Sequence, residues 1–393
     1  METQPWFNLI PQEQMIKWRR YFHAHPELSF KENKTSKEIT QILASFDQIT
    51  ITHPTPTSVL GTIKGAYPGK KILLRADIDA LPVKEETGLD FASQNDGVMH
   101  ACGHDTHTAI LLATTKVLTQ LRSQLHGTVQ VIFQHAEEQV PGGAKEIVAS
   151  GQLHNLDAVI GLHIMTGLKA GTVNIVTDGP VTTGADAFDL TIQGKGSHGS
   201  MPQEGIDPIT VGTEIINQLH TITSRFTPPK DLNVVTVGKF HSGVAVNVLP
   251  DTATIGGSVR TIDEDTRQAI ANRIKKIVKN TCDTYGASYQ LDYQFAYAAV
   301  INNPKIASLV KRCALKVLPK EMVPAGTMMS ASEDFSAYGK LAPLCFFLLG
   351  GGTEEEGYPY SNHSPKFIIA EDALLNGVKT EVESVLEFLK AEK

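Results

Sequence analysis

The sequence predicts an α/β fold: a mostly parallel sheet covered by helices, interrupted by a second, inserted domain. A chain of 393 residues is too long for one ordinary core. Short apolar segments alternate with amphipathic helical ones near both ends of the chain, as in parallel sheets. From about residue 185 to 297 the order becomes strand, helix, strand, strand, helix, strand, which is ferredoxin-like. We therefore expect a first domain made of residues 1–184 and 298–393, and an inserted domain of residues 185–297.

Four apolar segments of the first domain are expected to be strands that turn polar at their carboxyl ends. They are Ile72–Asp79, Gly127–Gln134, Asp157–His163 and Pro343–Leu349. Apolar residues near a period of 3.6 predict the intervening helices. These are residues 106–121 and 143–150, and an amphipathic helix over 371–391 ends the chain. Ligands of parallel sheets gather beyond the carboxyl ends of the strands, so the polar residues there are the first candidates for a site.

The inserted domain is expected to contain four strands and two helices. The strands are 188–193, 234–240, 253–260 and 288–295, and the helices are 207–223 and 263–285. This arrangement would form a ferredoxin-like α+β domain beside the parallel sheet.

Composition and charge indicate the kind of binding partner and the cellular compartment of the protein. The formal net charge is −7 and the chain has no basic stripe, which argues against nucleic acid and anionic membranes and favours a small-molecule substrate. The first residues lack a basic segment followed by an apolar one, and no apolar run has the length that a bilayer requires. The four cysteines have no paired spacing, which suits a reducing compartment. We expect a cytoplasmic protein.

Cys102 and His104 are the first candidate metal ligands. They lie two residues apart in a glycine-containing turn that precedes a helix, so both side chains can lie on one side of a tight loop. The positive end of the helix dipole there favours a thiolate, which has lone pairs enough to bridge two cations. Taken alone, the pair is equally compatible with a buried cysteine beside a capping histidine.

Glu137 and Glu138 directly follow an expected strand. Neighbouring side chains on extended backbone point in opposite directions, so one carboxylate can bind a metal while the other faces water. We assign Glu138 as the ligand, and Glu137 as the general base that takes a proton from water and delivers it to the leaving amine. An isolated pair of this kind is more often a solvated acidic turn.

Two further histidines and one aspartate complete the expected centre. His163 ends a strand and His363 lies in a polar loop, although each alone is more often a satisfied core or surface residue. Asp79 is the better of two acids, Asp77 and Asp79, to orient a ligand imidazole, unless both simply close a strand. Two divalent ions are expected: thiolate and imidazole suit zinc, and the carboxylate leaves manganese, cobalt and nickel open. The expected ligands are Cys102, His104, Glu138, His163 and His363.

The inserted domain offers three residues for contact with substrate. His198 lies among glycines and could stabilise an oxyanion. Asn247 and Arg260 could hold a carboxylate, for which a guanidinium is well shaped. Glycine-rich turns between strand and helix are also common for conformational reasons alone.

These motifs together closely resemble the M20 metallopeptidase family, and within it the amidohydrolase branch of aminoacylases, hippurate hydrolases, N-acetyldiaminopimelate deacetylases and auxin-conjugate hydrolases. The resemblance runs nearly end to end. It rests on the segments His23–Leu28, Arg75–Pro82, Met99–Asp105, Phe133–Glu138 and Ser332–Phe335.

The resemblance implies a di-metal exopeptidase-like catalytic domain with the five ligands above, Glu137 as base, and an inserted domain that serves as lid and homodimer interface. In relatives the counterpart of His198 completes the active site, in some of them from the neighbouring subunit. Arg75 stands where the peptidase branches carry a metal-binding histidine, which favours the amidohydrolase branch. His135 and Gln203 also depart from the common pattern and bear on the substrate range.

The function expected from the sequence is hydrolysis of the amide bond of N-acyl amino acids or similar small conjugates, which gives a carboxylic acid and a free amino acid. A dipeptidase or aminopeptidase of the same family is the alternative among enzymes. A catalytically silent binding homologue is the alternative of another class, although it would have no chemical need for both the ligand set and Glu137.

Overall fold

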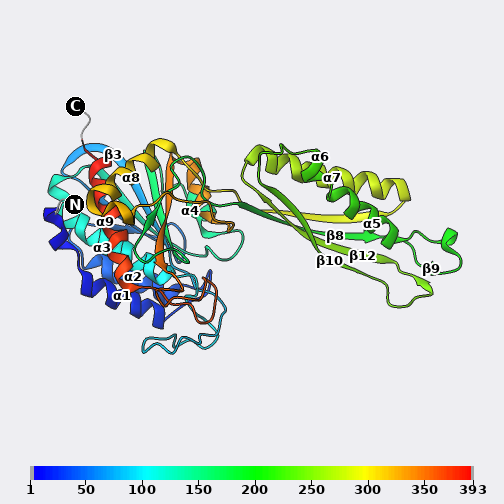
Figure 1. Ribbon diagram of the computed structural model, residues 1–393, viewed down its shortest axis with the longest axis horizontal. Helices are drawn as coiled ribbons and strands as arrows, with labels where there is room; N and C mark the ends of the chain where they lie inside the picture. Colours follow the sequence, from blue (N-terminus) through cyan, green and yellow to red (C-terminus); the bar gives the residue numbers. More distant parts are fainter. Residues whose placement is uncertain (1–3, 391–393) are drawn as a thin grey trace. The chain divides into compact units, whose positions relative to one another are not determined.

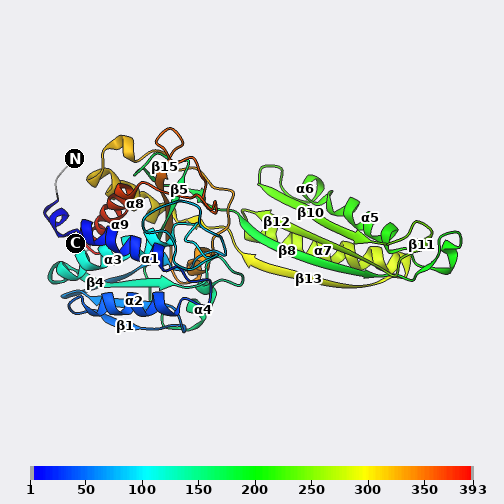
Figure 2. The same ribbon diagram turned by 90° about the horizontal axis from the view of Figure 1, so that it is seen from below.

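The computed structural model describes residues 4–390. The chain forms two compact units. Unit 1 consists of Met1–Val181, Ile301–Met329 and Asp334–Lys393, and unit 2 of Thr182–Val300 and Ser330–Glu333. Figures 1 and 2 show the elements of each unit from two directions.

Unit 1 is built on a seven-stranded sheet with the order β1-β2-β4-β3-β5-β15-β6. The strands are β1 Thr50–Thr52, β2 Val59–Lys64, β3 Tyr67–Asp77, β4 His126–Gln134, β5 Ala158–Thr166, β6 Val173–Asn174 and β15 Leu344–Gly352. The central four, β4, β3, β5 and β15, are parallel, whereas β1, β2 and β6 pair antiparallel at the edges. The expected α/β class with a mostly parallel sheet is confirmed.

Alternate residues of the central strands face two different layers. On one face Leu74 of β3 and Val131 of β4 join a large apolar core with residues of helices α1, α3, α8 and α9. Helix α2 packs on β1 and β2. The helices are α1 Gln12–Ala24, α2 Asn33–Ala44, α3 His104–Gln120, α8 Pro304–Val317 and α9 Leu374–Phe388.

The opposite face of the sheet is covered by α4 (Gly143–Ala149) and the 3₁₀ segment η5 (Asp334–Lys340). Phe335 packs against Phe346 of β15 with ring centroids 4.9 Å apart. Gly161 of β5 makes this approach possible, because a Cβ there would lie 2.7 Å from the Phe335 ring. The sheet is therefore buried on both faces, as its near-continuous apolar strands require.

Several elements differ from the expectation or were not foreseen. Helices α1, α2 and α8 are additional. The helix expected over 371–391 begins as a 3₁₀ turn, η6 (Glu371–Ala373), before α9, and Ala391 lies outside the described residues. Smaller elements complete the chain: η1 Pro5–Leu9, η2 Arg122–Gln124, η3 Pro202–Glu204, η4 Lys320–Met322, and the paired short strands β7 Gly179–Pro180 with β14 Ile301–Asn302 and β9 Ser197–His198 with β11 Val248–Leu249.

Unit 2 contains a four-stranded antiparallel sheet with the order β10-β12-β8-β13. Its elements follow the strand, helix, strand, strand, helix, strand order, with helices packed on the sheet around a separate apolar core. They are β8 Gly184–Gln193, α5 Pro208–Leu219, α6 Ile222–Arg225, β10 Asn233–Ser242, β12 Thr252–Thr261, α7 Glu264–Tyr285 and β13 Ser288–Tyr297.

The helix expected over 207–223 is interrupted between α5 and α6. Helix α5 ends at Leu219, and the backbone N–H of Thr221 donates to the carbonyl of Gln218 at 3.0 Å, three residues back, so the α-helical pattern is broken there. Within residues 4–390, none of the helices has the length and apolarity to cross a membrane.

One buried carboxyl group makes the stability of unit 1 depend on pH. Glu381 of α9 is 1% exposed and accepts a hydrogen bond from the Thr114 hydroxyl of α3 at 2.8 Å. Burial raises the pKa of Glu381 to about 8. The unfolded chain ionises this group near its ordinary value of 4.5, so the folded state binds the extra proton between these two pH values.

We expect the free energy of unfolding to fall as pH rises from 5 to 8, by up to about 1.4 kcal/mol per pH unit from this group. Glu381→Gln should remove that slope, because its amide has no proton to lose. Denaturant unfolding at several pH values measures the difference. Glu383→Gln is the matched control on the same helix, since Glu383 lies 3.5 Å from the Lys316 ammonium. Parallel pH curves for the wild type and Glu381→Gln would contradict the prediction.

Candidate metal centre

Side chains that can bind metal come together at the carboxyl ends of the parallel strands. The ligand atoms of Cys102, His104 and His163 lie within 4.8 Å of one another, and so do those of Cys102, Glu138 and His363. The Cys102 Sγ is 3.3 Å from Nε2 of both His163 and His363. His363 Nε2 is also 3.3 Å from Glu138 Oε1. All five expected ligands therefore converge on one place in unit 1, with Cys102 common to both groups.

The surroundings of these donors fit a pair of cations. Among the described residues, His104 Nε2 is buried without a hydrogen-bond partner, and Glu138 Oε1 has no contact of this kind besides the approach of His363 Nε2 at 3.3 Å. Such orphaned atoms are costly unless something else satisfies them. A sulfur, imidazole nitrogens and a carboxylate form the donor set of borderline divalent metals. The residues present thus suit the two-metal centre expected from the sequence.

Hydrogen bonds on the far side of the imidazoles set their orientation. His163 Nδ1 lies 2.6 Å from the carbonyl of Ile164, and His104 Nδ1 lies 2.9 Å from the carbonyl of Asp79. A carbonyl oxygen only accepts, so each Nδ1 carries a proton and Nε2 is the ring nitrogen that remains for a metal ion. Metal-binding histidines are held in this way. Both Nε2 atoms are directed into the group that contains Cys102.

Asp79 contacts two of the candidate ligands. Its Oδ1 lies 3.2 Å from His104 Nδ1, and its Oδ2 accepts from the Glu138 backbone N–H at 3.0 Å and from the Ser29 hydroxyl at 2.7 Å. Burial raises the pKa of Asp79, but these hydrogen bonds outweigh it and the net pKa is lowered. The carboxylate is therefore ionised and lies where it can orient the His104 imidazole, which is the role predicted for it from the sequence. Its contact with the Glu138 backbone was not predicted.

The expectation that the helix end favours a Cys102 thiolate is wrong for the protein alone. Burial, followed by the nearby Glu138, Glu137 and Asp77 carboxylates, raises the pKa of the Cys102 thiol well above its ordinary value. Burial lowers the pKa of His104, but Asp77, Asp79 and Glu138 raise it to about 10. The pKa of Cys102 is thus raised although the residue precedes α3, and cations beside the sulfur would favour its thiolate.

The expected geometry of Glu137 and Glu138 is also wrong. They do not lie on extended backbone, because the chain bends at residues 137–139 after a left-handed Ala136 with φ of 50°. A carboxylate oxygen of each lies within 4.8 Å of the other and of His104. The bend, and not strand alternation, brings both carboxylates to the same centre.

Asn362 is a residue of this centre that sequence reasoning missed. Its amide donates to the carbonyls of Cys102 and Ile164, each at 3.1 Å, and its oxygen accepts from the Thr166 N–H at 3.3 Å. It thus joins the loop of Cys102, the strand of His163 and the loop that carries His363. In the sequence, only its position directly before His363 pointed to a role at this centre.

Arg75 and His107 form a buried layer beneath the ligands. Arg75 donates to Asp77 Oδ2 at 2.6 Å and to Asp334 Oδ1 at 2.9 Å. His107 Nδ1 lies 2.5 Å from Asp77 Oδ1, and its Nε2 accepts from the Ile164 N–H at 2.8 Å. Asp77 therefore already has a guanidinium and an imidazole as hydrogen-bond partners. Its Oδ2 lies 3.6 Å from His104 Nε2.

The three expected substrate contacts lie in unit 2, at two ends of its sheet. His198 and Asn247 are neighbours, because His198 pairs with Val248 and the Asn247 carbonyl accepts from Gly199 N–H at 2.9 Å. Both are exposed. Arg260 pairs with Ala185 at the opposite end of β12. Strand geometry puts the two ends about 25 Å apart, so one copy of unit 2 does not bring the three together.

Comparison with known proteins identifies the family. Residues 73–387 match the family described as peptidase family M20/M25/M40. The chain belongs to this family. It is 45% identical to an N-acyl-L-amino acid amidohydrolase of Geobacillus stearothermophilus over 288 residues, 73% of this chain and 78% of that protein.

Two further relatives of this M20 family chain bear on its site. It is 38% identical to thermostable carboxypeptidase 1 of Saccharolobus solfataricus, with 92% of both chains covered. The solved structure of the YXEP protein of Bacillus subtilis, named a dinuclear metal binding peptidase of the M20 family, superposes with a TM-score of 0.83 at 33% identity, covering 97% of this chain and 99% of that one. The resemblance inferred from the sequence is confirmed.

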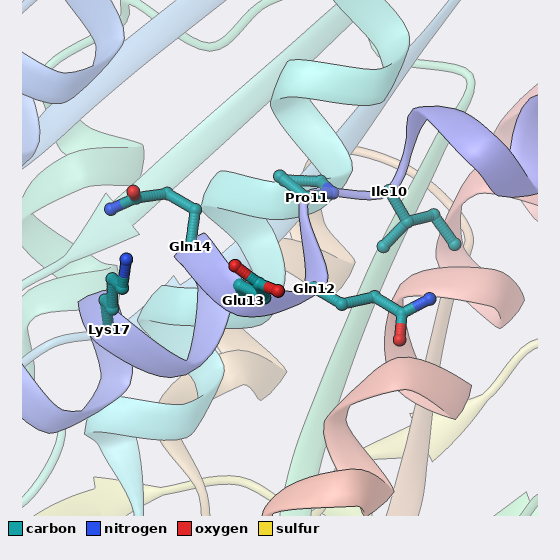
Figure 3. A pocket seen from close by; sticks show the side chains of 6 residues that line it. All are labelled: Ile10, Pro11, Gln12, Glu13, Gln14 and Lys17. Atoms are coloured by element: carbon teal, nitrogen blue, oxygen red, sulfur yellow. The ribbon is translucent and has the colours of Figure 1, made fainter.

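A separate hollow in unit 1 of this M20 protein has no part in the centre. Figure 3 shows it beside the first turns of α1, and none of the candidate ligands lines it. Its lining residues are Ile10, Pro11, Gln12, Glu13, Gln14 and Lys17.

The shared position of Cys102 gives a test by metal removal. Because both ligand groups contain its sulfur, Cys102→Ala should lower the content of both bound ions. His163→Ala removes a donor from one group only and should spare about half of the metal. Elemental analysis of dialysed protein measures both. Cys345 of β15 is also a buried free cysteine, but it belongs to neither ligand group. Cys345→Ala is therefore the matched control and should keep wild-type metal content. Full metal occupancy in Cys102→Ala would refute the assignment.

Proposed function

We propose that this chain is a metal-dependent amidohydrolase. It cleaves the amide bond of N-acyl amino acids or similar small conjugates to a carboxylic acid and a free amino acid. The observation that carries the proposal is the convergence of five metal-competent side chains with a sixth group, the Glu137 carboxylate, beside them in unit 1. Similarity to the N-acyl-L-amino acid amidohydrolase supports the substrate class.

The ligands proposed for two divalent ions divide into two sets that share the thiolate of Cys102. His104 and His163 complete one set, and Glu138 and His363 the other. Ions bound there supply polarisation of the substrate carbonyl and a lowered pKa for water. Zinc or manganese suits these donors best, with cobalt and nickel as the next candidates.

Glu137 is proposed as the general base. It is 6% exposed, and a carboxylate oxygen lies within 4.8 Å of ligand atoms of His104 and Glu138. The residue takes a proton from the attacking water as the C–O bond forms. It then delivers that proton to the amide nitrogen as the C–N bond breaks, which releases the amine. The carboxylate ends the cycle ionised, so no further proton source is required.

His198, Asn247 and Arg260 are proposed to contact the substrate from unit 2. One guanidinium nitrogen of Arg260 is buried without a hydrogen-bond partner among residues 4–390, which suits a substrate carboxylate. His198 is suited to donate to the oxyanion that develops at the carbonyl. A small substrate does not span about 25 Å, so a site that uses all three requires two copies of unit 2.

A homodimer through unit 2 is therefore part of the proposal, with unit 1 as the catalytic domain and unit 2 as lid. Strand β10 is an edge of its sheet and exposes Val234 and Phe240. The turn that follows it exposes Val244 and Val246 almost fully. An apolar sheet edge of this kind invites pairing with a second chain. The cytoplasm is proposed as the compartment, because all four cysteines are free thiols.

A peptidase activity is the second candidate. The similarity to thermostable carboxypeptidase 1 favours cleavage of a peptide bond, although a carboxypeptidase recognises a free α-carboxylate and not a free α-amine. A dipeptidase or aminopeptidase needs the free α-amine that an N-acyl amino acid lacks. Acyl substrates and free dipeptides therefore distinguish the two activities. The alternative of a silent binding homologue has less support, because the base and the ligands are all present together.

Glu137→Gln tests the proposed reaction. The variant should retain both metals and substrate binding, because Glu137 is not among the proposed ligands, but kcat should fall about 10²- to 10⁴-fold with the loss of the base. The assay uses N-acetyl and N-benzoyl amino acids beside free dipeptides, with metal content measured on the same samples. Glu146→Gln is the matched control, because Glu146 is an acid on α4 that pairs with His135.

Turnover of the acyl substrates by the wild type and its loss in Glu137→Gln would support the proposal. Equal activity in the two proteins would remove Glu137 as the base. Cleavage of free dipeptides alone would replace the amidohydrolase with a peptidase.

The dimer is tested at the β10 edge. Val234→Glu should convert dimers to monomers, because a charge would be buried at the apolar edge. Sedimentation velocity measures the mass of the species. Tyr289→Glu on β13, the other edge of the sheet, is the matched control and should leave the dimer intact. Monomeric wild-type protein, or equal disruption by both variants, would contradict an interface at β10.

A further inference from the structure

Two residues in strained backbone donate to a single carboxylate oxygen near the centre. Phe30 has φ of 64° and Ala136 has φ of 50°, a left-handed region that is unfavourable for residues with a side chain. The backbone N–H of each donates to Oε1 of Glu32 at 2.9 Å. Phe30 also packs edge-on against His135, with ring centroids 5.5 Å apart. Glu32 thus joins the segment before α2 to the loop after β4.

The side chain of Glu32 does not cap its own helix. It occupies the N-cap position of α2 but makes no side-chain capping hydrogen bond. Glu27 does this instead, by accepting from the backbone N–H of Thr35 at 2.8 Å and from its hydroxyl at 3.0 Å. The distant contact of Glu32 with Ala136 is therefore not a by-product of helix capping.

The loop that Glu32 contacts carries Glu137 and Glu138. Both backbone polar groups of Ala136 are hydrogen-bonded. Its N–H donates to Glu32, and its carbonyl accepts from the Gly143 N–H at 2.9 Å. Two residues later Asp79 accepts from the Glu138 N–H at 3.0 Å. The backbone around Glu137 is thus held by one carboxylate on each side of it.

A carboxyl group is costly in the place that Glu32 occupies. Its side chain is fully buried, and burial together with the nearby Asp79 carboxylate raises the pKa of Glu32 to about 7. An apolar side chain would avoid that cost but would leave the N–H of the fully buried Ala136 without its acceptor. A purely structural role would be filled more cheaply by a neutral residue in an ordinary turn.

We propose that Glu32 is a positioning residue of the reaction, which fixes the left-handed turn at Ala136 and so aims the Glu137 carboxylate. The inference rests on the proposed role of Glu137 as base. Asp79 secures Glu138 from the other side, so loss of Glu32 displaces Glu137 and leaves the proposed metal ligand in place. Small displacements of a catalytic group are expensive, at about 10²-fold in rate for roughly 1 Å.

Three substitutions separate positioning from folding. Glu32→Ala removes the acceptor, and kcat should fall about 10- to 100-fold with KM and metal content near wild type. Glu32→Gln keeps an oxygen at the same reach and should restore most of kcat. Glu32→Asp places a favoured capping residue at the N-cap, which holds α2 but is too short for Ala136. Its kcat should fall as in Glu32→Ala, while its melting temperature should lie above that of Glu32→Ala because the N-cap of α2 is kept.

Glu27→Ala is the matched control, because it removes the true cap of α2. It should lower the melting temperature and keep kcat of the folded protein. The measurements are kcat, KM, metal content and thermal unfolding of the full chain on an N-acyl amino acid. Wild-type kcat in both Glu32→Ala and Glu32→Asp would overturn the inference, as would equal losses in Glu32→Gln and Glu32→Ala. Full activity of Glu137→Gln would instead contradict the proposed role of Glu137 as base. The two proposals are therefore tested by different variants.

Discussion

Buried negative charge at the carboxyl edge of the parallel sheet is the constraint around which unit 1 is organised. Asp77 and Asp79 are essentially inaccessible, and Glu137 is only 6% exposed. A buried carboxylate without partners is strongly destabilising, so each must be neutralised or hydrogen-bonded. Asp77 is satisfied by Arg75 and His107, and Asp79 by His104 and the Glu138 N–H. Among the candidate ligands, His104 Nε2 and Glu138 Oε1 are buried without a hydrogen bond, and positive ions fit beside them.

The Arg75 guanidinium connects this edge to the rest of the unit. It is fully buried and donates to Gln134 Oε1 at 2.8 Å, besides its bonds to Asp77 and Asp334. Asp334 in turn accepts from the Gln134 amide and from the Ala144 N–H. These bonds tie β3, β4, α4 and η5 together. Removal of one member of such a network leaves an uncompensated charge, at a cost of about 3–5 kcal/mol. The buried network next to the ligands is therefore costly to disrupt.

Much of this arrangement was predictable from local patterns, and the remainder depends on contacts that no local pattern contains. Near-continuous apolar runs with polar ends predicted the central strands, and the rule for parallel sheets then gathered their end residues at one edge. The pKa of Cys102 was not predictable from its turn, because the carboxylates that raise it come from other segments. Glu32 was missed because its partner is 104 residues away. Helix α2 was missed because its cap, Glu27, lies outside it and its first turn is polar.

The two units hold different parts of the chemistry. The candidate ligands and Glu137 all belong to unit 1, where α-helices and η5 bury the sheet on both faces. His198, Asn247 and Arg260 belong to unit 2, where His198 is on β9, Asn247 is in the loop before β11 and Arg260 is on β12. Changes to exposed loops and edges disturb packing little, whereas changes around buried charges disturb it strongly. Under the proposed function, the exposed substrate contacts His198 and Asn247 can therefore vary without disturbing the metal-competent cluster of unit 1.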